Sequence, residues 1–237
     1  MKVTLLVPVL NEIEGLKKIM PRIKREWVDQ IIIIDGNSTD GSLEYAKENG
    51  YFVYSQKELG VRSAYIEALP YVEGDVVITF SPDGNSIPEL IPQLVEKMKE
   101  GFDMVIASRY LNNAKSYDDD MVTAFGNWFF TKTVNFLFHA KYTDAMVIFR
   151  AYKKRLIDDL DLAKKEGPKL SEKIFRCKES EFGWEPLLSV RAAKRKLKVG
   201  EIPGDEPARF GDKSKLKIIN WGGAIYLQFL REKFVWH

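Results

Sequence analysis

Cysteine and histidine are scarce in this chain of 237 residues, which contains one cysteine, Cys177, and two histidines, His139 and His237. A single cysteine excludes an internal disulfide framework and fits a reducing compartment. Neither histidine lies in a motif that would activate the thiol, which argues against a cysteine nucleophile. The composition therefore favours a cytoplasmic protein without thiol chemistry.

Long apolar runs and a strong charge imbalance are also absent. No apolar stretch reaches the roughly 18 to 20 residues that span a bilayer, and residues 1–9 are too short, and lack the cleavage pattern, for a signal peptide. A formal net charge of +2 is too small to indicate a nucleic-acid partner. No Gly-x-Gly-x-x-Gly run follows a predicted strand, which sets aside a Rossmann dehydrogenase.

The chain does contain an alternation of apolar strands and amphipathic helices. A hydrophobic content of 45% over this length is enough for one sizeable core. Asn11 is predicted to cap the first helix. Strands and helices are expected in turn at 3–9, 13–23, 31–34, 43–48, 51–55, 60–69, 75–80, 87–99 and 103–107. Strands separated by helices predict a Rossmann-like α/β fold, with a mostly parallel central sheet and helices on both faces.

The stretch VVITFSPDGNSIPE, residues 76–89, is the most informative. A β-branched strand ends there in a polar turn with Asp83 and Asn85, and Pro88 then opens a helix. Ligands of open α/β sheets bind beyond the carboxyl ends of the strands. A carboxylate and an amide oxygen at that place suit Mg²⁺ or Mn²⁺. The alternative is that Asp-Gly-Asn is only a turn.

Several motifs together resemble one enzyme family. The segments VPVLNE, IIIIDGNSTDGS, SPDGN and IASRY, in this order and spacing, are similar to family 2 glycosyltransferases with the GT-A fold. Within that family the chain most resembles the dolichyl-phosphate mannose synthase-like branch. The later segments TDAMVIFRAYKK, FGWEPLLSVRAAKRKLKVGEIP and ARFGDKSKL extend the resemblance over nearly the whole chain.

The resemblance implies an activity of the hexosyltransferase type. It implies transfer of a sugar, with inversion, from a UDP- or GDP-linked nucleoside-diphosphate-sugar donor to a polyprenyl phosphate or glycan acceptor. It also implies Mg²⁺ or Mn²⁺ as cofactor. The nucleotide pocket would be lined by Pro8, Asn11, Glu12 and Asp35. Alternatives for the two acids are a first-turn acid favoured by the helix dipole for Glu12 and a cap on the next helix for Asp35.

The donor turn departs from the family pattern at one position. Ser81 stands where the usual Asp-x-Asp-x-Gln turn has its first acid, while Asp83 and Asn85 keep the other two positions. Ser81 and Asp83 are expected to contact the donor, with Asp83 and Asn85 as metal ligands. With one carboxylate fewer, metal affinity should be lower, and the donor diphosphate should supply much of the coordination.

Cationic side chains are needed to stabilise a departing diphosphate. Arg109 in IASRY and Arg209 in ARFGDKSKL are the candidates, because guanidinium groups make paired hydrogen bonds to phosphate oxygens. Lys213 and Lys215 lie nearby, with a solvated loop as the alternative. Arg150 resembles the family arginine that helps to hold an acceptor phosphate, and its alternative is a structural ion pair.

A general base is needed only for a hydroxyl acceptor, since a phosphate acceptor is already ionised. Asp144 and Glu185 are the acids considered. The apolar spacing after Glu185 places it at the start of a helix facing the cleft, where an acid commonly serves as base in glycosyltransferases that use hydroxyl acceptors. The alternative is a helix N-terminal glutamate without chemistry.

The acceptor segment, residues 111–138, lacks the arginine-rich run often found in lipid-phosphate mannose synthases. Asp118, Asp119 and Asp120 stand there instead, and would either repel a phosphorylated acceptor or simply initiate the next helix. The aromatic stripe of that helix, from Met121 onward, is expected to be a core face rather than a binding surface.

The carboxyl end predicts a basic, amphipathic helical segment, 213–237, after a GT-A glycosyltransferase domain at 1–212. Trp, Tyr and Lys around an apolar face suit peripheral contact with the inner face of a membrane, to which the basic run 191–198 could add. The helix could instead pack on its own domain or on a second subunit of a homodimer. The loop 162–178 is expected to be an acceptor-side lid.

Two other functional classes are weighed. A sugar-1-phosphate nucleotidyltransferase would need a glycine-rich phosphate loop near residues 7–15, and none is present. A catalytically impaired GT-A-like binding or scaffolding module is the second alternative, motivated by Ser81 and by the missing arginine cluster.

Overall fold

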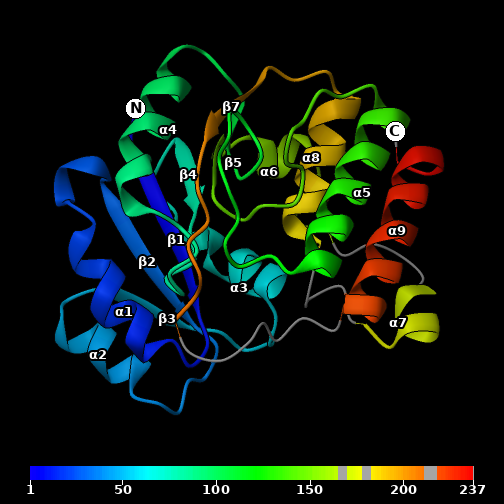
Figure 1. Cartoon of the computed structure of the whole chain (residues 1–237). Helices are drawn as coiled ribbons and strands as arrows, with labels where there is room; N and C mark the ends of the chain where they lie inside the picture. The colour runs from blue at the N-terminus through cyan, green and yellow to red at the C-terminus, as the bar shows by residue number, and fades with distance from the viewer. Residues whose placement is uncertain (165–169, 178–182, 211–217, 237) are drawn as a thin grey trace.

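A single seven-stranded sheet organises the protein (Figure 1). The computed structural model describes residues 1–164, 170–177, 183–210 and 218–236. The strand order is β3-β2-β1-β4-β6-β5-β7, and β6 runs antiparallel to both of its neighbours. The strands are β1 (Val3–Val9), β2 (Gln30–Asp35), β3 (Phe52–Ser55), β4 (Val76–Thr79), β5 (Met104–Ser108), β6 (Arg150–Lys153) and β7 (Val199–Pro203). The predicted α/β class with a mostly parallel sheet is confirmed.

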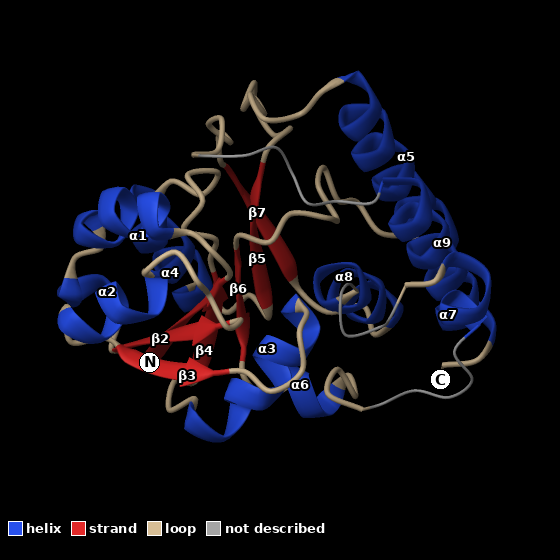
Figure 2. Ribbon diagram, turned by 90° about the horizontal axis from the view of Figure 1, so that it is seen from below, coloured by secondary structure: helices blue, strands red, loops and turns tan. Residues whose placement is uncertain are grey.

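Helices cover both faces of the sheet, as Figure 2 shows. On one side lie α1, α2 and α4, and on the other lie α3, α6 and α8. The α-helices are α1 (Ile13–Ile19), α2 (Ser42–Glu48), α3 (Val61–Ala68), α4 (Ile91–Lys99), α5 (Met121–Phe138), α6 (Leu156–Asp159), α7 (Leu170–Phe175), α8 (Trp184–Lys194) and α9 (Ile218–Phe234). Single 3₁₀ turns occur at η1 (Met20–Arg22), η2 (Arg25–Trp27), η3 (Leu69–Tyr71) and η4 (Pro88–Leu90).

Burial explains why the central strands are uniformly apolar. Every residue of β4 and β5 is buried, as expected for strands covered on both faces. The register sets Val9 of β1 beside Asp35 of β2, so both strands end at the same edge of the sheet. The loops that follow β1, β2, β4 and β5 therefore meet at one edge, where a ligand would bind.

The start of α1 differs from the sequence expectation. Asn11 has a left-handed φ of 55°, and the N-cap residue is Glu12, which makes no side-chain capping bond. The free N–H groups are satisfied from the loop before α2 and from the first residue of α2. Asp40 accepts from Ile13 N and Ser42 Oγ accepts from Glu12 N, both at 3.0 Å. The prediction that Asn11 caps this helix is wrong, since the cap is supplied across two loops.

The aromatic stripe of α5 is not a core face. Phe125 is 63% exposed, Trp128 is 55% exposed and Phe136 is 81% exposed, while only Thr131, Val134 and Phe138 of this helix are buried. The helix stands beside α8 and α9, away from the sheet, so only a narrow strip of it is covered (Figure 2). The expectation of a core face was wrong for that reason.

Helix α9 packs on its own domain, one of the alternatives left open by the sequence. It lies against α5, α7 and α8, and its Phe229 is fully buried. A buried ion pair fastens it, because Arg191 of α8 donates to Glu232 at 2.8 Å and both side chains are 0% exposed. Within the described residues, no helix combines the length and the apolar content needed to cross a membrane.

Candidate active site

A cavity of about 800 Å³ opens at the carboxyl edge of the sheet. Its walls come from the turn after β4, the end of β5, the amino-terminal half of α5, the start of α8 and the segment after β7. The sequence-predicted residues among its lining are Ser81, Asp83, Asn85, Arg109, Glu185 and Arg209. The topology thus brings these six residues together from four separate parts of the chain.

The turn after β4 has a fixed shape. Asn85 N donates to Asp83 Oδ1 at 3.1 Å, and Gly84 adopts a left-handed φ of +101° that disfavours other residues. A Cβ on Gly84 would lie 2.9 Å from the ring of Phe210, whose own N–H donates to the Asp83 carbonyl at 2.7 Å. The segment after β7 is therefore fastened onto this turn.

The oxygen atoms of this turn fit a divalent cation. Asn85 Oδ1 is buried and has no hydrogen-bond partner among the described residues, while Asn85 Nδ2 donates to Asp118 at 3.2 Å. An orphaned buried oxygen beside the Asp83 carboxylate is the arrangement that a hard cation would satisfy. In the described part of the chain, no three His, Cys, Asp or Glu side chains gather into a ready-made metal site. Further ligands would have to come from outside this turn.

Arg209 lies between two carboxylates of the cavity. Its Nη2 donates to Asp118 at 2.6 Å, and its Nη1 lies 3.9 Å from Asp83 Oδ2. Burial alone would raise the pKa of Asp118, but the hydrogen bonds and charge of Arg209 offset this and hold it below its ordinary value. The guanidinium thus lines the cavity beside the turn after β4.

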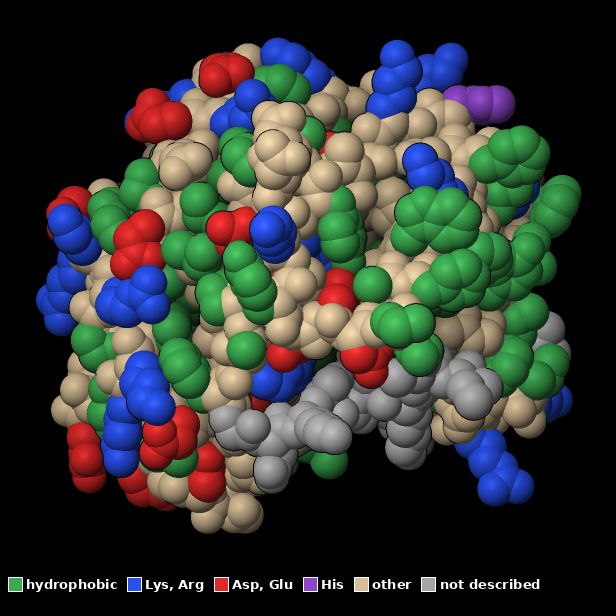
Figure 3. Space-filling model, viewed as in Figure 1, with side chains coloured by type: hydrophobic (Ala, Val, Ile, Leu, Met, Phe, Trp, Pro, Cys, Tyr) green, Lys and Arg blue, Asp and Glu red, His purple; other side chains and the backbone are tan. Residues whose placement is uncertain are grey.

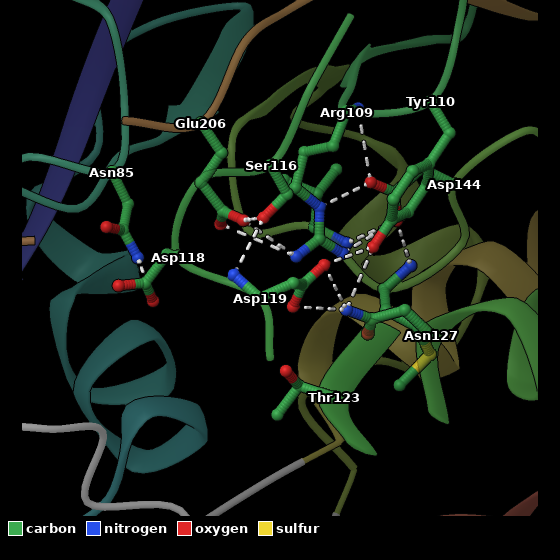
Figure 4. A network of polar contacts seen from close by, with 12 residues as sticks. Asn85, Arg109, Tyr110, Ser116, Asp118, Asp119, Thr123, Asn127, Asp144 and Glu206 are labelled. Atoms are coloured by element: carbon green, nitrogen blue, oxygen red, sulfur yellow. Dashed lines mark hydrogen bonds and ion pairs between the residues drawn. The ribbon is translucent and has the colours of Figure 1, made fainter. Parts of the chain in front are cut away.

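Arg109 is held by two acids (Figure 4). It donates from Nε to Asp144 Oδ2 at 2.6 Å, and its Nη1 lies 3.3 Å from Glu206 Oε2. Burial raises the pKa of Glu206, whereas Arg109 outweighs burial at Asp144 and keeps that carboxyl ionised. Asp144 is 0% exposed and fully engaged, so it is not placed to act as a base.

Glu185 lies in the first turn of α8, facing the cavity as predicted. It is 8% exposed, and its Oε1 has no hydrogen-bond partner among the described residues. Burial raises the pKa of this carboxyl to about 7, although Arg150 and Tyr65 both act to lower it. A carboxyl that titrates near neutrality can take or give a proton at working pH.

Arg150 does not line the cavity. It is 0% exposed, and its donors reach Ser189 Oγ at 2.8 Å, Val147 O at 2.9 Å and Glu185 O at 3.3 Å. These contacts support the chain around the cavity floor and the first turn of α8. The geometry matches a structural role, although through carbonyl groups rather than through an ion pair.

The four residues expected at the nucleotide lie at the carboxyl ends of β1 and β2 and in the loop after β1, outside the lining of this cavity. They are Pro8, Asn11, Glu12 and Asp35. Asp35 is buried and accepts from Asn37 N at 2.9 Å, and Asn11 Oδ1 accepts from Thr39 N at 2.8 Å. Asp35 therefore shapes the loop instead of capping α2, whose Ser42 N is held by Asp40.

The acidic run before α5 divides among three roles. Asp120 caps the helix by accepting from Val122 N and Thr123 N, so the helix-initiating alternative holds for this residue. Asp119 accepts from Tyr110 and Asn127 (Figure 4). Of the three, Asp118 is the one that accepts from Asn85, in the turn after β4.

Three cavity residues were missed or misassigned by sequence reasoning. Arg62 of α3, Asp118 and Glu206 all line the cavity. Arg62 and Glu206 lie outside every family motif, and Asp118 was distinguishable only by its position in an acidic run. Lys213 and Lys215 lie outside the described residues, as does part of the predicted lid.

Comparisons with known proteins identify the family. The sequence model described as "Glycosyl transferase family 2" matches residues 4–161. A dolichol-phosphate mannosyltransferase of Pyrococcus furiosus is 27% identical over 240 residues, which cover 98% of this chain and 62% of that relative. An undecaprenyl-phosphate 4-deoxy-4-formamido-L-arabinose transferase of Proteus mirabilis is 26% identical, over 92% of this chain and 65% of that relative. The chain thus spans just under two thirds of the length of these relatives.

Solved structures agree on the fold. Glucosyl-3-phosphoglycerate synthase from Mycobacterium tuberculosis, in complex with Mn²⁺, UDP-glucose and phosphoglyceric acid, superposes with a TM-score of 0.66. The match covers 97% of this chain and 77% of that chain, at 20% identity, and it bears on the GT-A fold alone. From the family match over most of the sheet, together with the named relatives, the chain belongs to glycosyl transferase family 2, a family of glycosyltransferase enzymes.

Proposed function

We propose that this protein transfers a sugar from a UDP- or GDP-linked donor to a polyprenyl phosphate or a glycan hydroxyl, with inversion at the sugar carbon. One observation carries the proposal: a single cavity unites Asp83, Asn85 and Arg209 at one end with Glu185 on another wall. The polyprenyl-phosphate acceptors named for the relatives support one acceptor class. The UDP-glucose complex of the mycobacterial enzyme supports the donor class.

The donor end is assigned from charge and hydrogen-bonding capacity. Asp83 and Asn85 would hold Mg²⁺ or Mn²⁺, which when bound stabilises the charge of the departing diphosphate. Arg209 would donate to phosphate oxygens from the opposite side. Pro8, Asn11, Glu12 and Asp35 would receive the nucleoside beyond the ends of β1 and β2, and Ser81 would donate to the donor from the cavity wall.

The acceptor end is assigned to Glu185. A hydroxyl acceptor must lose its proton as it attacks, and a carboxylate with a pKa of about 7 can accept that proton. A phosphate acceptor needs no base. With that acceptor, Glu185 would help to position the acceptor and would not take a proton from it. Attack from the side opposite the diphosphate in a single displacement would invert the sugar carbon.

A lipid-linked acceptor would require the cavity to face a membrane. The exposed aromatic face of α5 begins beside the cavity, because Val122 and Gly126 line it and Phe125 lies between them. Phe129 stacks on Tyr226 of α9 with ring centroids 6.1 Å apart, which extends the apolar surface (Figure 3). At the far end of α5, Lys141, Lys194, Lys196 and Lys233 line a depression of about 590 Å³. Apolar rings beside lysines suit peripheral binding to the anionic inner face of a membrane.

The test is calorimetric titration with UDP and with GDP, each with and without Mn²⁺. We expect metal-dependent binding of one nucleotide, lost in Asp83→Ala and kept in the control Asp159→Ala, whose side chain is 55% exposed on α6. Donor turnover with a polyprenyl phosphate then separates an enzyme from a catalytically impaired binding module. If neither nucleotide binds and no donor is turned over, the proposal fails.

A further inference from the structure

The turn after β4, residues 81–85, has one carboxylate where the family pattern Asp-x-Asp-x-Gln has two. Ser81 cannot supply a charge, so the turn itself offers Asp83 and the neutral Asn85. A divalent cation with its diphosphate would then meet one negative side chain from this segment. The surroundings of the turn show where a second carboxylate is available.

Asp118 reaches this turn from a different part of the chain. It belongs to the loop between β5 and α5, and its Oδ2 accepts from Asn85 Nδ2 at 3.2 Å (Figure 4). The same Asn85 side chain presents its buried, unpartnered Oδ1. Asp118 therefore accepts from the nitrogen of the Asn85 side chain, and the oxygen of the same side chain is available to another group.

A cation already lies between the two carboxylates. The Arg209 guanidinium contacts Asp118 at 2.6 Å and approaches Asp83 to 3.9 Å. Both carboxylates therefore have the same guanidinium group as a cationic neighbour. Acids that share a cationic neighbour are stabilised by positive charge, and a divalent ion supplies more charge than Arg209 does.

We propose that Asp118 supplies the second carboxylate of the divalent-cation site, in place of the acid that Ser81 lacks. The inference rests on the proposed function, since it assumes that a cation binds with the donor. In this arrangement the cation and Arg209 compete for Asp118. The competing interpretation is that Asp118 serves only as the ion-pair partner of Arg209.

The experiment measures Mn²⁺ affinity, not activity. Free Mn²⁺ is followed by electron paramagnetic resonance while the protein is titrated at saturating UDP, or GDP if that is the nucleotide bound. We expect Asp118→Asn to weaken Mn²⁺ binding at least about tenfold, the loss typical when a group that supports a metal is removed. Asp119→Asn is the matched control, because it removes a neighbouring charge whose carboxylate is engaged by Tyr110 and Asn127.

Two further variants separate the interpretations. Adding Ser81→Asp to Asp118→Asn should restore most of the Mn²⁺ affinity, because one carboxylate then replaces the other. Arg209→Lys, which keeps a positive charge near the diphosphate but removes the guanidinium hydrogen bonds to Asp118, should not reproduce the loss. Wild-type affinity in Asp118→Asn, an equal loss in Arg209→Lys, or a failure of Ser81→Asp to restore binding would each overturn the assignment.

The outcome distinguishes this inference from the proposed function. If the wild-type protein binds nucleotide and Mn²⁺ but Asp118→Asn does so equally well, only the role of Asp118 fails. If the wild-type protein binds no Mn²⁺ with either nucleotide, the assignment of Asp118 fails, and nucleotide binding and donor turnover then decide the proposed function. Circular dichroism of each variant excludes unfolding as the cause of a loss.

Discussion

Glu185 places an ionisable carboxyl where its charged form is disfavoured. In an unfolded chain this group loses its proton near its ordinary pKa of 4.5, whereas burial keeps the proton on in the folded protein until about pH 7. Between these values the folded state binds more protons than the unfolded state, so the free energy of unfolding falls as the pH rises. Tuning of this kind is common at groups that exchange protons during catalysis.

We predict that Glu185→Gln removes this pH dependence. The wild-type protein should lose stability relative to the variant, by on the order of 3 kcal/mol, as the pH rises from about 4.5 to above 7. Urea unfolding of both proteins at pH 5 and pH 8 measures the difference. Glu100→Gln, at a side chain that is 61% exposed, is the control, and parallel pH dependences in wild type and Glu185→Gln would contradict the prediction.

At the scale of single residues, the sequence predicted which residues line the cavity better than it predicted their hydrogen-bond and ion-pair partners. Asp83, Asn85, Arg109, Glu185 and Arg209 were all predicted, and all line one cavity. Their partners could not be predicted, because they come from loops without periodic signals. Nothing in the chain order pairs Arg109 with Glu206, although the two lie 3.3 Å apart.

Helix α5 shows how an element can be recognised and yet misplaced. Its apolar residues predicted a helix correctly, but composition alone does not tell a core face from an exposed one. Strand β6 is a second example, because the pattern TDAMVIF predicts a strand over residues 143–149, whereas β6 is Arg150–Lys153. Its antiparallel insertion between β4 and β5 depends on tertiary packing. Short strands carry no direction in their sequence.

We predict that the exposed rings of α5 bind membranes. Replacing Phe125 and Trp128 with serine removes two large apolar groups from water-facing positions, so binding to vesicles with anionic lipid should weaken at least about tenfold. Co-sedimentation with such vesicles measures the change. Leu59→Ser, at an exposed leucine on a loop before α3, is the control and should bind as the wild type does. Equal binding by the double variant would instead favour a protein partner for this face.

The whole molecule couples ligand binding to stability. Because the site draws on segments from residue 81 to residue 209, a ligand that binds only the folded cavity stabilises the entire fold. Asp83, Asn85 and the diphosphate would share the cation, so nucleotide and metal should stabilise more together than the sum of each alone.

We predict a rise in melting temperature of about 5–10 °C with UDP or GDP plus Mn²⁺ at a hundredfold excess over the dissociation constant. Mn²⁺ alone or nucleotide alone should produce much smaller shifts. Differential scanning calorimetry measures all three conditions. Asp83→Ala should abolish the synergy, and additive shifts in the wild-type protein would argue that metal and nucleotide bind independently.

The contact between Gly84 and Phe210 also has a consequence for protein engineering. The donor turn and the segment that carries Arg209 are far apart in the sequence, yet the ring lies where any side chain at position 84 would lie. The Nζ atom of Lys18 in α1 also lies over that ring, 4.7 Å from its centroid. A chimaera that takes its carboxyl-terminal part from another family member must therefore take residues 83–85 and 206–210 from the same parent. Otherwise the turn after β4 and the segment after β7 will not pack against each other.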